Sequence, residues 1–99
     1  MKARLVTIYW RDIPAQVNAQ SGRTREKAPL PMDFQLAIDR ATNAAELFTY
    51  HESVKFWRRT DRPCGPDLAF EATAEADRLA AAYPDERLAA LIRNLGYEA

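Results

Sequence analysis

Hydrophobic residues near the start of the chain alternate in the way that is typical of β-strands. The segment from Leu5 to Trp10 is dense in β-branched and aromatic residues, and both of its faces are partly apolar. A polar corner, Arg11 to Pro14, follows, and from Ala15 to Gln20 apolar residues alternate with amides. We therefore predict a central strand and a half-buried strand that pair as an antiparallel hairpin.

Farther along the chain, apolar residues recur every three or four positions, which indicates helices. One apolar stripe covers residues 34–45, a second covers residues 68–83 and a third covers residues 88–95. Pro84 stops the second helix and starts the third, and Gly96 suits the C′ position that ends the third. We expect the last two helices to form a hairpin.

Three other segments are assigned from their turn residues and from their weak hydrophobic periodicity. Residues 21–31 carry almost nothing apolar, so we predict a basic, exposed loop. Residues 52–60 fit either a strand or a helix, and the adjacent Phe56 and Trp57 together with Val54 favour a strand. Residues 62–66, with two prolines and a glycine, form a break.

These elements predict one α+β domain over residues 1–99, in the order β-β-α-β-α-α. It would have two layers, a three-stranded antiparallel sheet with helices on one face and a second face left open to solvent. The residues facing the helices would be Val6, Ile8, Ala15, Val17, Val54 and Phe56. The open face would carry Thr7, Tyr9, Gln16, Asn18, Gln20, Lys55, Trp57 and Arg59.

Composition excludes several classes of protein. The longest apolar runs are far shorter than the ~20 residues that span a bilayer, and no signal-type segment follows the N-terminus, so we expect a cytoplasmic protein without membrane contact. Cys64 and His51 are the single cysteine and histidine, which excludes an internal disulfide and a zinc site of the usual type. We expect no metal and no cofactor.

Charge is balanced overall but uneven along the chain. Residues 1–62 hold eleven Lys or Arg against seven Asp or Glu, and residues 63–99 hold three against seven. Such polarity can steer a partner or favour self-association, although solvated helix faces also produce it.

Exposed aromatic and basic residues on the open face suggest a protein interface, because Trp, Tyr and Arg are enriched at binding hot spots. Zero net charge and the lack of an RNP-type motif make nucleic acid an unlikely partner. The predicted partner-binding residues are Tyr9, Arg11, Asp12, Gln16, Lys55, Trp57 and Arg59. Trp57 packed into the core is the alternative.

Arginine forks suit phosphate and carboxylate groups, so an anion site is a second possibility. Its residues would be Arg11, Arg58, Arg59 and Arg62, joined by the basic residues of positions 23–27 if the two segments meet in space. Alternatively, Asp12 is a turn residue that bonds its own backbone and Arg11 is merely solvated. No oriented nucleophile accompanies His51 or Cys64, so we predict no catalytic residue.

The stretch RLVTIYWRDIPAQV, residues 4–17, is distinctive, and further matching pieces are FQLAIDRA, WRR and YPDERL. On these the chain resembles the bacterial "virulence factor" domain family, which also occurs as the terminal domain of conserved virulence factor C proteins. The resemblance implies no established chemistry. Small members are similar to proteins encoded near methyl-transfer and folate-linked reductase enzymes, which implies an accessory role. We therefore predict a non-enzymatic adaptor that binds another protein or a second copy of itself, with a small-ligand-binding enzyme subunit as the alternative.

Overall fold

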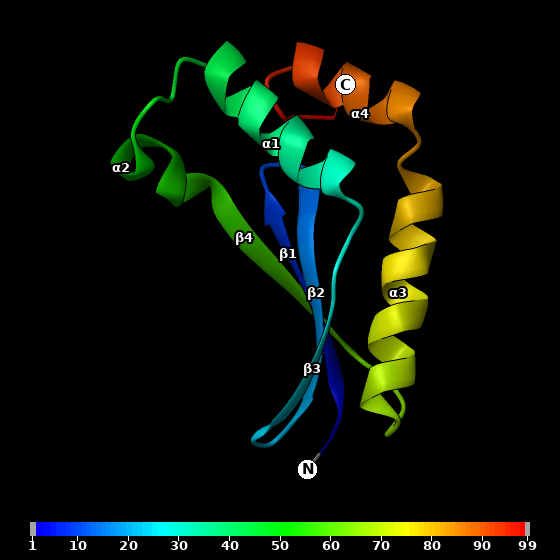
Figure 1. Ribbon diagram of the computed structural model, residues 1–99. Helices are drawn as coiled ribbons and strands as arrows, with labels where there is room; N and C mark the ends of the chain where they lie inside the picture. Colours follow the sequence, from blue (N-terminus) through cyan, green and yellow to red (C-terminus); the bar gives the residue numbers. More distant parts are fainter. Residues whose placement is uncertain (1, 99) are drawn as a thin grey trace.

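The computed structural model describes residues 2–98 and has an α+β fold with an antiparallel sheet, as the sequence predicts. Strands β1 (Arg4–Trp10) and β2 (Ile13–Ser21) form the expected hairpin. Four strands are present, in the spatial order β3-β2-β1-β4, whereas the sequence predicted three. Figure 1 shows this twisted sheet with helix α3 along one side.

The additional strand is β3 (Thr24–Ala28), which lies in the segment expected to be a loop. It pairs with β2 from Val17 to Ser21 through a tight turn in which Gly22 adopts a φ of 60°. Four of the five β3 residues are exposed, because β3 is an edge strand. An exposed edge strand needs no alternating apolar residues, so hydrophobic periodicity could not reveal it.

The ambiguous segment is divided between the two predicted structures. Helix α2 (Tyr50–Ser53) and the 3-10 turn η1 (Val54–Phe56) come first, and strand β4 (Trp57–Pro63) follows. The strand prediction is therefore wrong for residues 52–56 and right from Trp57 onward. Thr49 caps α2 by accepting the Glu52 N–H at 3.2 Å, which fixes a helical turn before the strand begins.

The two faces of β1 are exchanged relative to the prediction, whereas Val17 of β2 faces the helices and Gln16, Asn18 and Gln20 face away from them, as predicted. Leu5 pairs with Ala19 and Thr7 pairs with Val17, and Leu5, Val17 and Ala19 are buried beneath α3 (Leu68–Ala82). The prediction that Val6 and Ile8 face the helices is wrong, because a bulge between Ile8 and Tyr9 shifts the register by one residue. Tyr9 and Thr7 consequently lie on the side of α3.

Two apolar clusters form the core. The first lies between α3 and the sheet, and the second surrounds the end of the β1–β2 hairpin, where Trp10 is fully buried. Helices α1 (Met32–Ala44) and α4 (Asp85–Arg93) pack together over this second cluster. The predicted hairpin of α3 and α4 is therefore wrong, and Figure 1 shows α4 beside α1 instead. Buried residues of the second cluster are Trp10, Ile13, Phe34, Ala37, Ile38, Ala41, Leu88 and Leu91.

Helix α4 ends with the hydrogen bonds of a Schellman motif. The N–H of Gly96 donates to the Leu91 carbonyl at 2.7 Å, and the N–H of Leu95 donates to the Ile92 carbonyl at 3.1 Å. Leu95, with a φ of 60°, thus occupies the C′ position predicted for Gly96. The glycine lies one residue later, where a Cβ would approach the Trp10 ring to 2.8 Å. Among residues 2–98, no helix is long and apolar enough to cross a membrane.

Candidate functional site

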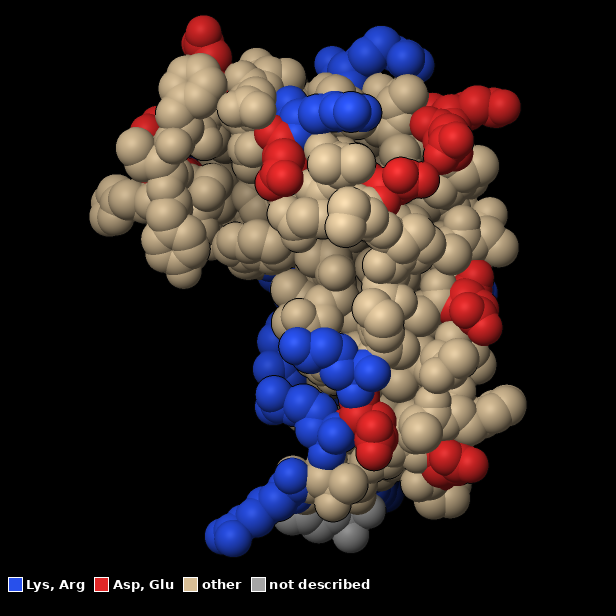
Figure 2. All heavy atoms as spheres, in the orientation of Figure 1, with Lys and Arg blue, Asp and Glu red and all other residues tan. Residues whose placement is uncertain are grey.

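The side of the sheet that faces away from α3 carries mainly polar and basic side chains, and we call it the open face. Strand alternation places on it Arg4, Val6 and Ile8 of β1, Gln16, Asn18 and Gln20 of β2, Arg25 and Lys27 of β3, and Trp57, Arg59 and Asp61 of β4. Trp10 and Ile13 lie on the same side at the hairpin end, where the second apolar cluster buries them, and neither cluster contains any residue of the open face itself. Figure 2 shows Lys and Arg side chains gathered on the side of the sheet away from α3.

The centre of the open face is covered by its own polar side chains. Val6 is only 3% exposed and Asn18 only 4%, although Val6 belongs to neither apolar cluster. Gln16 donates to the Asn18 side chain at 3.3 Å, so the amides of β2 are ordered. The centre of the open face is therefore a hydrogen-bonding surface over a buried valine.

Basic residues outnumber acidic ones on the open face. Arg4, Arg25, Lys27 and Arg59 accompany Asp61, which is the one carboxylate of the set. Arg59 donates two hydrogen bonds of 3.1 Å to Asp61, and Arg4 lies 3.7 Å from the same carboxylate. These hydrogen bonds from Arg59, opposed by partial desolvation and aided by Arg4, hold the pKa of Asp61 below its usual value.

One end of the open face is closed. The Trp10 Nε1 donates to the Ser53 carbonyl at 3.1 Å, and the Trp10 ring meets Phe56 edge-on at 6.0 Å. Helix α2 and η1 therefore lie over this end of the sheet. Trp57, 39% exposed, lies at the boundary, and Lys55 lies on η1 with its ammonium 5.3 Å from the Phe56 ring.

Arg11 holds the hairpin end to the rest of the chain. Its guanidinium carbon lies 4.0 Å from the Phe56 ring centre, 4.5 Å from that of Tyr97 and 4.9 Å from that of Trp10. Its Nη1 donates to the Leu95 carbonyl at 2.7 Å. These contacts stabilise a backbone that adopts a φ of 52°, and they engage Arg11 within the protein.

Asp12 also joins distant parts of the chain. Its carboxylate accepts the Glu98 N–H at 2.8 Å and the Arg58 Nη2 at 3.1 Å, and its own N–H donates to the Gly96 carbonyl. Arg58 in turn donates to the Arg11 carbonyl and stacks 4.3 Å over the Tyr9 ring. Neither a solvated arginine nor a local Asx turn describes this corner.

The predicted partner-binding residues are thus distributed over three places. Gln16, Trp57 and Arg59 share the open face, and Lys55 lies beside it on η1. Tyr9 is on the opposite side of the sheet, and the Arg11–Asp12 corner binds the C-terminal segment. Sequence reasoning missed Arg25 and Lys27 as members of the same surface, because it treated their segment as a loop.

The predicted anion-binding arginines do not converge. Arg58 and Arg62 alternate with Arg59 along β4, so they point to the opposite face. Arg62 binds Glu75 of α3 at 3.1 Å. Each of Arg11, Arg58, Arg59 and Arg62 therefore already contacts an acceptor of the same chain.

Glu75 is a charged residue of α3, yet it is only 6% exposed. It accepts hydrogen bonds of 2.7 Å from both Nε and Nη2 of Arg78 and one of 3.1 Å from Arg62. The Arg78 hydrogen bonds lower the pKa of Glu75, burial opposes them and Arg62 adds to them. A cleft of about 170 Å³ lies here between α3 and β4, also bordered by Tyr9 and Thr7.

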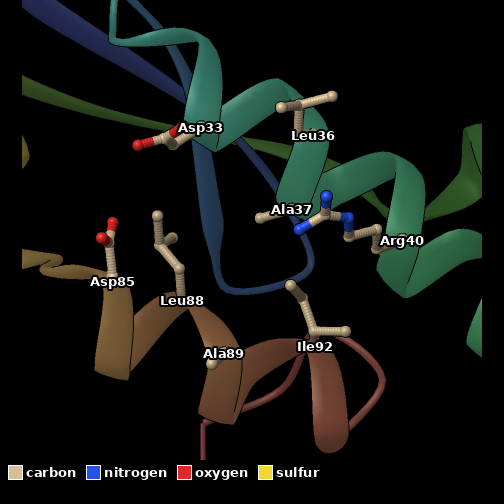
Figure 3. A pocket seen from close by; sticks show the side chains of 8 residues that line it. All are labelled: Asp33, Leu36, Ala37, Arg40, Asp85, Leu88, Ala89 and Ile92. Atoms are coloured by element: carbon tan, nitrogen blue, oxygen red, sulfur yellow. The ribbon is translucent and has the colours of Figure 1, made fainter.

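A second hollow lies between α1 and α4, with a volume of about 360 Å³. Figure 3 shows Asp33 and Asp85 together at one end and Arg40 with Ile92 at the other. Leu88 lies between these ends and belongs to the second core cluster. This hollow is the surface groove along the line where α1 and α4 pack together.

The potential catalytic residues remain isolated. His51 is exposed on α2, and Cys64 is half-buried beyond the end of β4. Burial raises the pKa of the Cys64 thiol, Glu71 raises it further and Arg62 lowers it, which disfavours a reactive thiolate. Within the described part of the chain, no group of His, Cys, Asp or Glu side chains could hold a metal ion.

A comparison with protein families matches a region that includes most of the distinctive stretch of residues 4–17. Neither the curated proteins nor the solved structures include a match to this chain. The family model described as "Virulence factor" matches residues 8–92, which cover β4, all the helices except the end of α4, and most of the hairpin. The chain therefore belongs to the virulence factor family.

Proposed function

We propose that this domain is a non-enzymatic protein-interaction module whose open face binds an acidic surface of a partner protein. The observation that carries the proposal is the composition of the open face. Helices of the described chain cover only its closed end, and the rest presents four basic residues and a single carboxylate. Charge complementarity across such a surface steers association and selects partners.

The chemistry of the open face favours a protein over nucleic acid. Sheet domains that hold single-stranded RNA stack successive bases on several aromatic side chains. On the described strands, the aromatic residues of this side are Trp10, which is fully buried, and Trp57, which lies at the closed end. The amides of Gln16, Asn18 and Gln20 instead provide donors and acceptors for backbone and carboxylate groups.

An adaptor beside methyl-transfer or folate-linked enzymes is the specific role that we propose. It rests on the resemblance to small family members and on a surface suited to docking. In this role the domain would supply no reacting group, and its partner would carry the chemistry.

Affinity purification from the native cell tests the proposal with a charge-reversed variant. The double variant R25E/K27E changes two exposed residues of β3 that take part in no ion pair within residues 2–98. The matched control R40E/R93E changes the net charge by the same amount on α1 and α4.

We expect wild type and R40E/R93E to retain the same partner, and R25E/K27E to lose it. With the purified partner, the Kd of R25E/K27E should rise about tenfold or more, and the wild-type Kd should rise with salt. Equal retention by both double variants would refute the open face as the binding surface.

The small-ligand alternative is tested separately. It assigned an anion to Arg11, Arg58 and Arg59, which bind intramolecular acceptors in the structure. A thermal-shift screen with folates, nucleotides and phosphates measures any such binding, because a ligand that binds the folded state raises the melting temperature. We expect no shift.

A further inference from the structure

Among the described residues, 2–98, strand β4 is an edge of the sheet with no strand on its outer side. It pairs with β1 alone, all seven of its residues are exposed, and Figure 1 shows no element beyond it. The other edge strand, β3, has α3 packed on one face of the sheet beside it. An exposed edge is a template for pairing with another strand.

The hydrogen bonds at the ends of β4 define which backbone groups point outward. The Arg11 N–H donates to the Phe56 carbonyl at 3.0 Å, and the Cys64 N–H donates to the Ala3 carbonyl at 3.1 Å. Even-numbered residues of β4 therefore direct their backbone groups toward β1, and odd-numbered residues direct theirs outward. The Trp57 N–H bonds the Val54 carbonyl, and Pro63 has no N–H. The outward donors left for a partner strand are the N–H groups of Arg59 and Asp61.

The side chains of these two residues favour one antiparallel register between two copies of β4. If the strands pair around Thr60, Arg59 of one copy lies directly opposite Asp61 of the other, and both free N–H groups find a carbonyl. Moving the centre of pairing to residue 59 or 61, a register shift of two residues, places Arg59 opposite Arg59 or Asp61 opposite Asp61, and like charges directly opposite are destabilising. Arg59 and Asp61 already pair within each chain, and in the register centred on Thr60 each gains a second opposite charge from the other copy, whereas the two alternative registers add a like charge. Charge therefore favours the register centred on Thr60.

The side chains at the other paired positions are compatible with this register. Trp57 lies opposite Pro63 of the second copy, which covers part of an exposed indole. Arg58 lies opposite Arg62 of the second copy, but each already binds a carboxylate of its own chain at 3.1 Å. Their mutual repulsion is thereby reduced.

We propose that two copies of this chain associate through antiparallel β4 strands centred on Thr60 and form one continuous eight-stranded sheet. Antiparallel strands that pair edge to edge keep equivalent side chains on one side, so the two open faces form one larger basic surface. This proposal goes beyond the open-face function and does not depend on it, because the edge and the face are different surfaces.

The test measures the mass of the full chain in solution by size-exclusion chromatography with light scattering. We expect wild type at twice the 11.3 kDa chain mass. The variant R59D places two carboxylates opposite each other across the interface, and D61R places two guanidinium groups opposite each other, so each variant alone should be monomeric. An equimolar mixture of R59D and D61R restores opposite charges across the interface, and we expect the doubled mass to return.

This mixing result distinguishes the interface from a structural role, because mixing leaves each chain's internal contacts unchanged. A second measurement needs no charge variant. In a C64S background, T60C should form an intermolecular disulfide under mild oxidation, because residues at a non-hydrogen-bonded antiparallel pair lie about 4.5 Å apart at Cα. T24C on the β3 edge, in the same background, should not. A monomeric wild type, or no disulfide from T60C beyond the T24C level, would overturn the proposal.

Discussion

The buried carboxylate of Glu75 gives the sharpest prediction about stability. Replacing it in E75Q keeps the shape of the side chain and removes the charge that accepts three hydrogen bonds from Arg78 and Arg62. Hydrogen bonds to charged groups contribute about 1.5–3 kcal/mol each where both partners are buried. Here both arginine side chains are more than half exposed, so solvent screens the interaction.

We therefore expect E75Q to lower the free energy of unfolding at pH 7 by about 1–2 kcal/mol, well below the sum of three buried bonds. For a domain of this size, each kcal/mol corresponds to a melting-temperature decrease of about 4–8 °C. D77N is the control, because it makes the same kind of change on an exposed α3 residue. We expect D77N to stay within about 0.5 kcal/mol of wild type.

The effect of E75Q must also depend on pH in one direction. The folded state lowers the pKa of Glu75, so the ionised carboxylate contributes stability above the unfolded-state pKa near 4.5. That contribution is lost as the pH falls through the lower, folded-state value. Urea unfolding between pH 7 and pH 3 should therefore show the difference between wild type and E75Q decreasing below about pH 4.5.

Subtracting the E75Q curve from the wild-type curve isolates this residue, because Asp61, whose pKa is also lowered, is unchanged in both proteins. A difference that stays constant down to pH 3, or that grows, would refute the assignment of the stabilisation to the ionised carboxylate. A D77N loss as large as that of E75Q would refute the role of burial.

Three further predictions concern packing. G96A should destabilise the fold by about 2–4 kcal/mol in urea, because Gly96 has a φ of 96° and a Cβ would lie 2.8 Å from Trp10; a stability equal to wild type would contradict this. W10A should cost about 3–5 kcal/mol and W57A only about 1–2, in line with their burial; the fluorescence of the tryptophan left in each variant should be red-shifted in W10A and blue-shifted in W57A, and the reverse order would contradict the assignment. Cys64 should react with a thiol reagent at pH 8 more slowly than free cysteine, because burial raises its pKa; a faster reaction would contradict it.

The helical periodicity predicted more of the fold than the strand pattern did. The buried positions of α1 and α3 lie on the expected stripes, because helix faces are set by spacing within one segment. Glu75 is a polar exception among the buried positions of α3. Its partner Arg78 at i+3 can be seen in the sequence, but the burial of Glu75 also depends on Arg62, which comes from β4.

The faces of β1 could not be assigned from its sequence alone, whereas the alternation of Val17 with the amides of β2 predicted the faces of β2. Both alternations of β1 contain apolar residues, Leu5 on one side and Val6 on the other, so the pattern did not select a face. The bulge beside Ile8 decides the register, and a bulge depends on contacts with the whole sheet. For this reason, the prediction that Tyr9 and Trp57 share one surface is wrong.

The family, the α+β class, the three long helices and the hairpin could all be predicted from residue patterns, because these features depend on local spacing and on one distinctive stretch. Coordinates were needed to establish that β3 completes the sheet, that Arg11 is enclosed by Phe56 and Tyr97, and which basic residues share the open face. These latter features are contacts between segments far apart in the chain. Exposed edge strands and paired arginines leave no periodic signal within any one segment, so no local pattern could predict them.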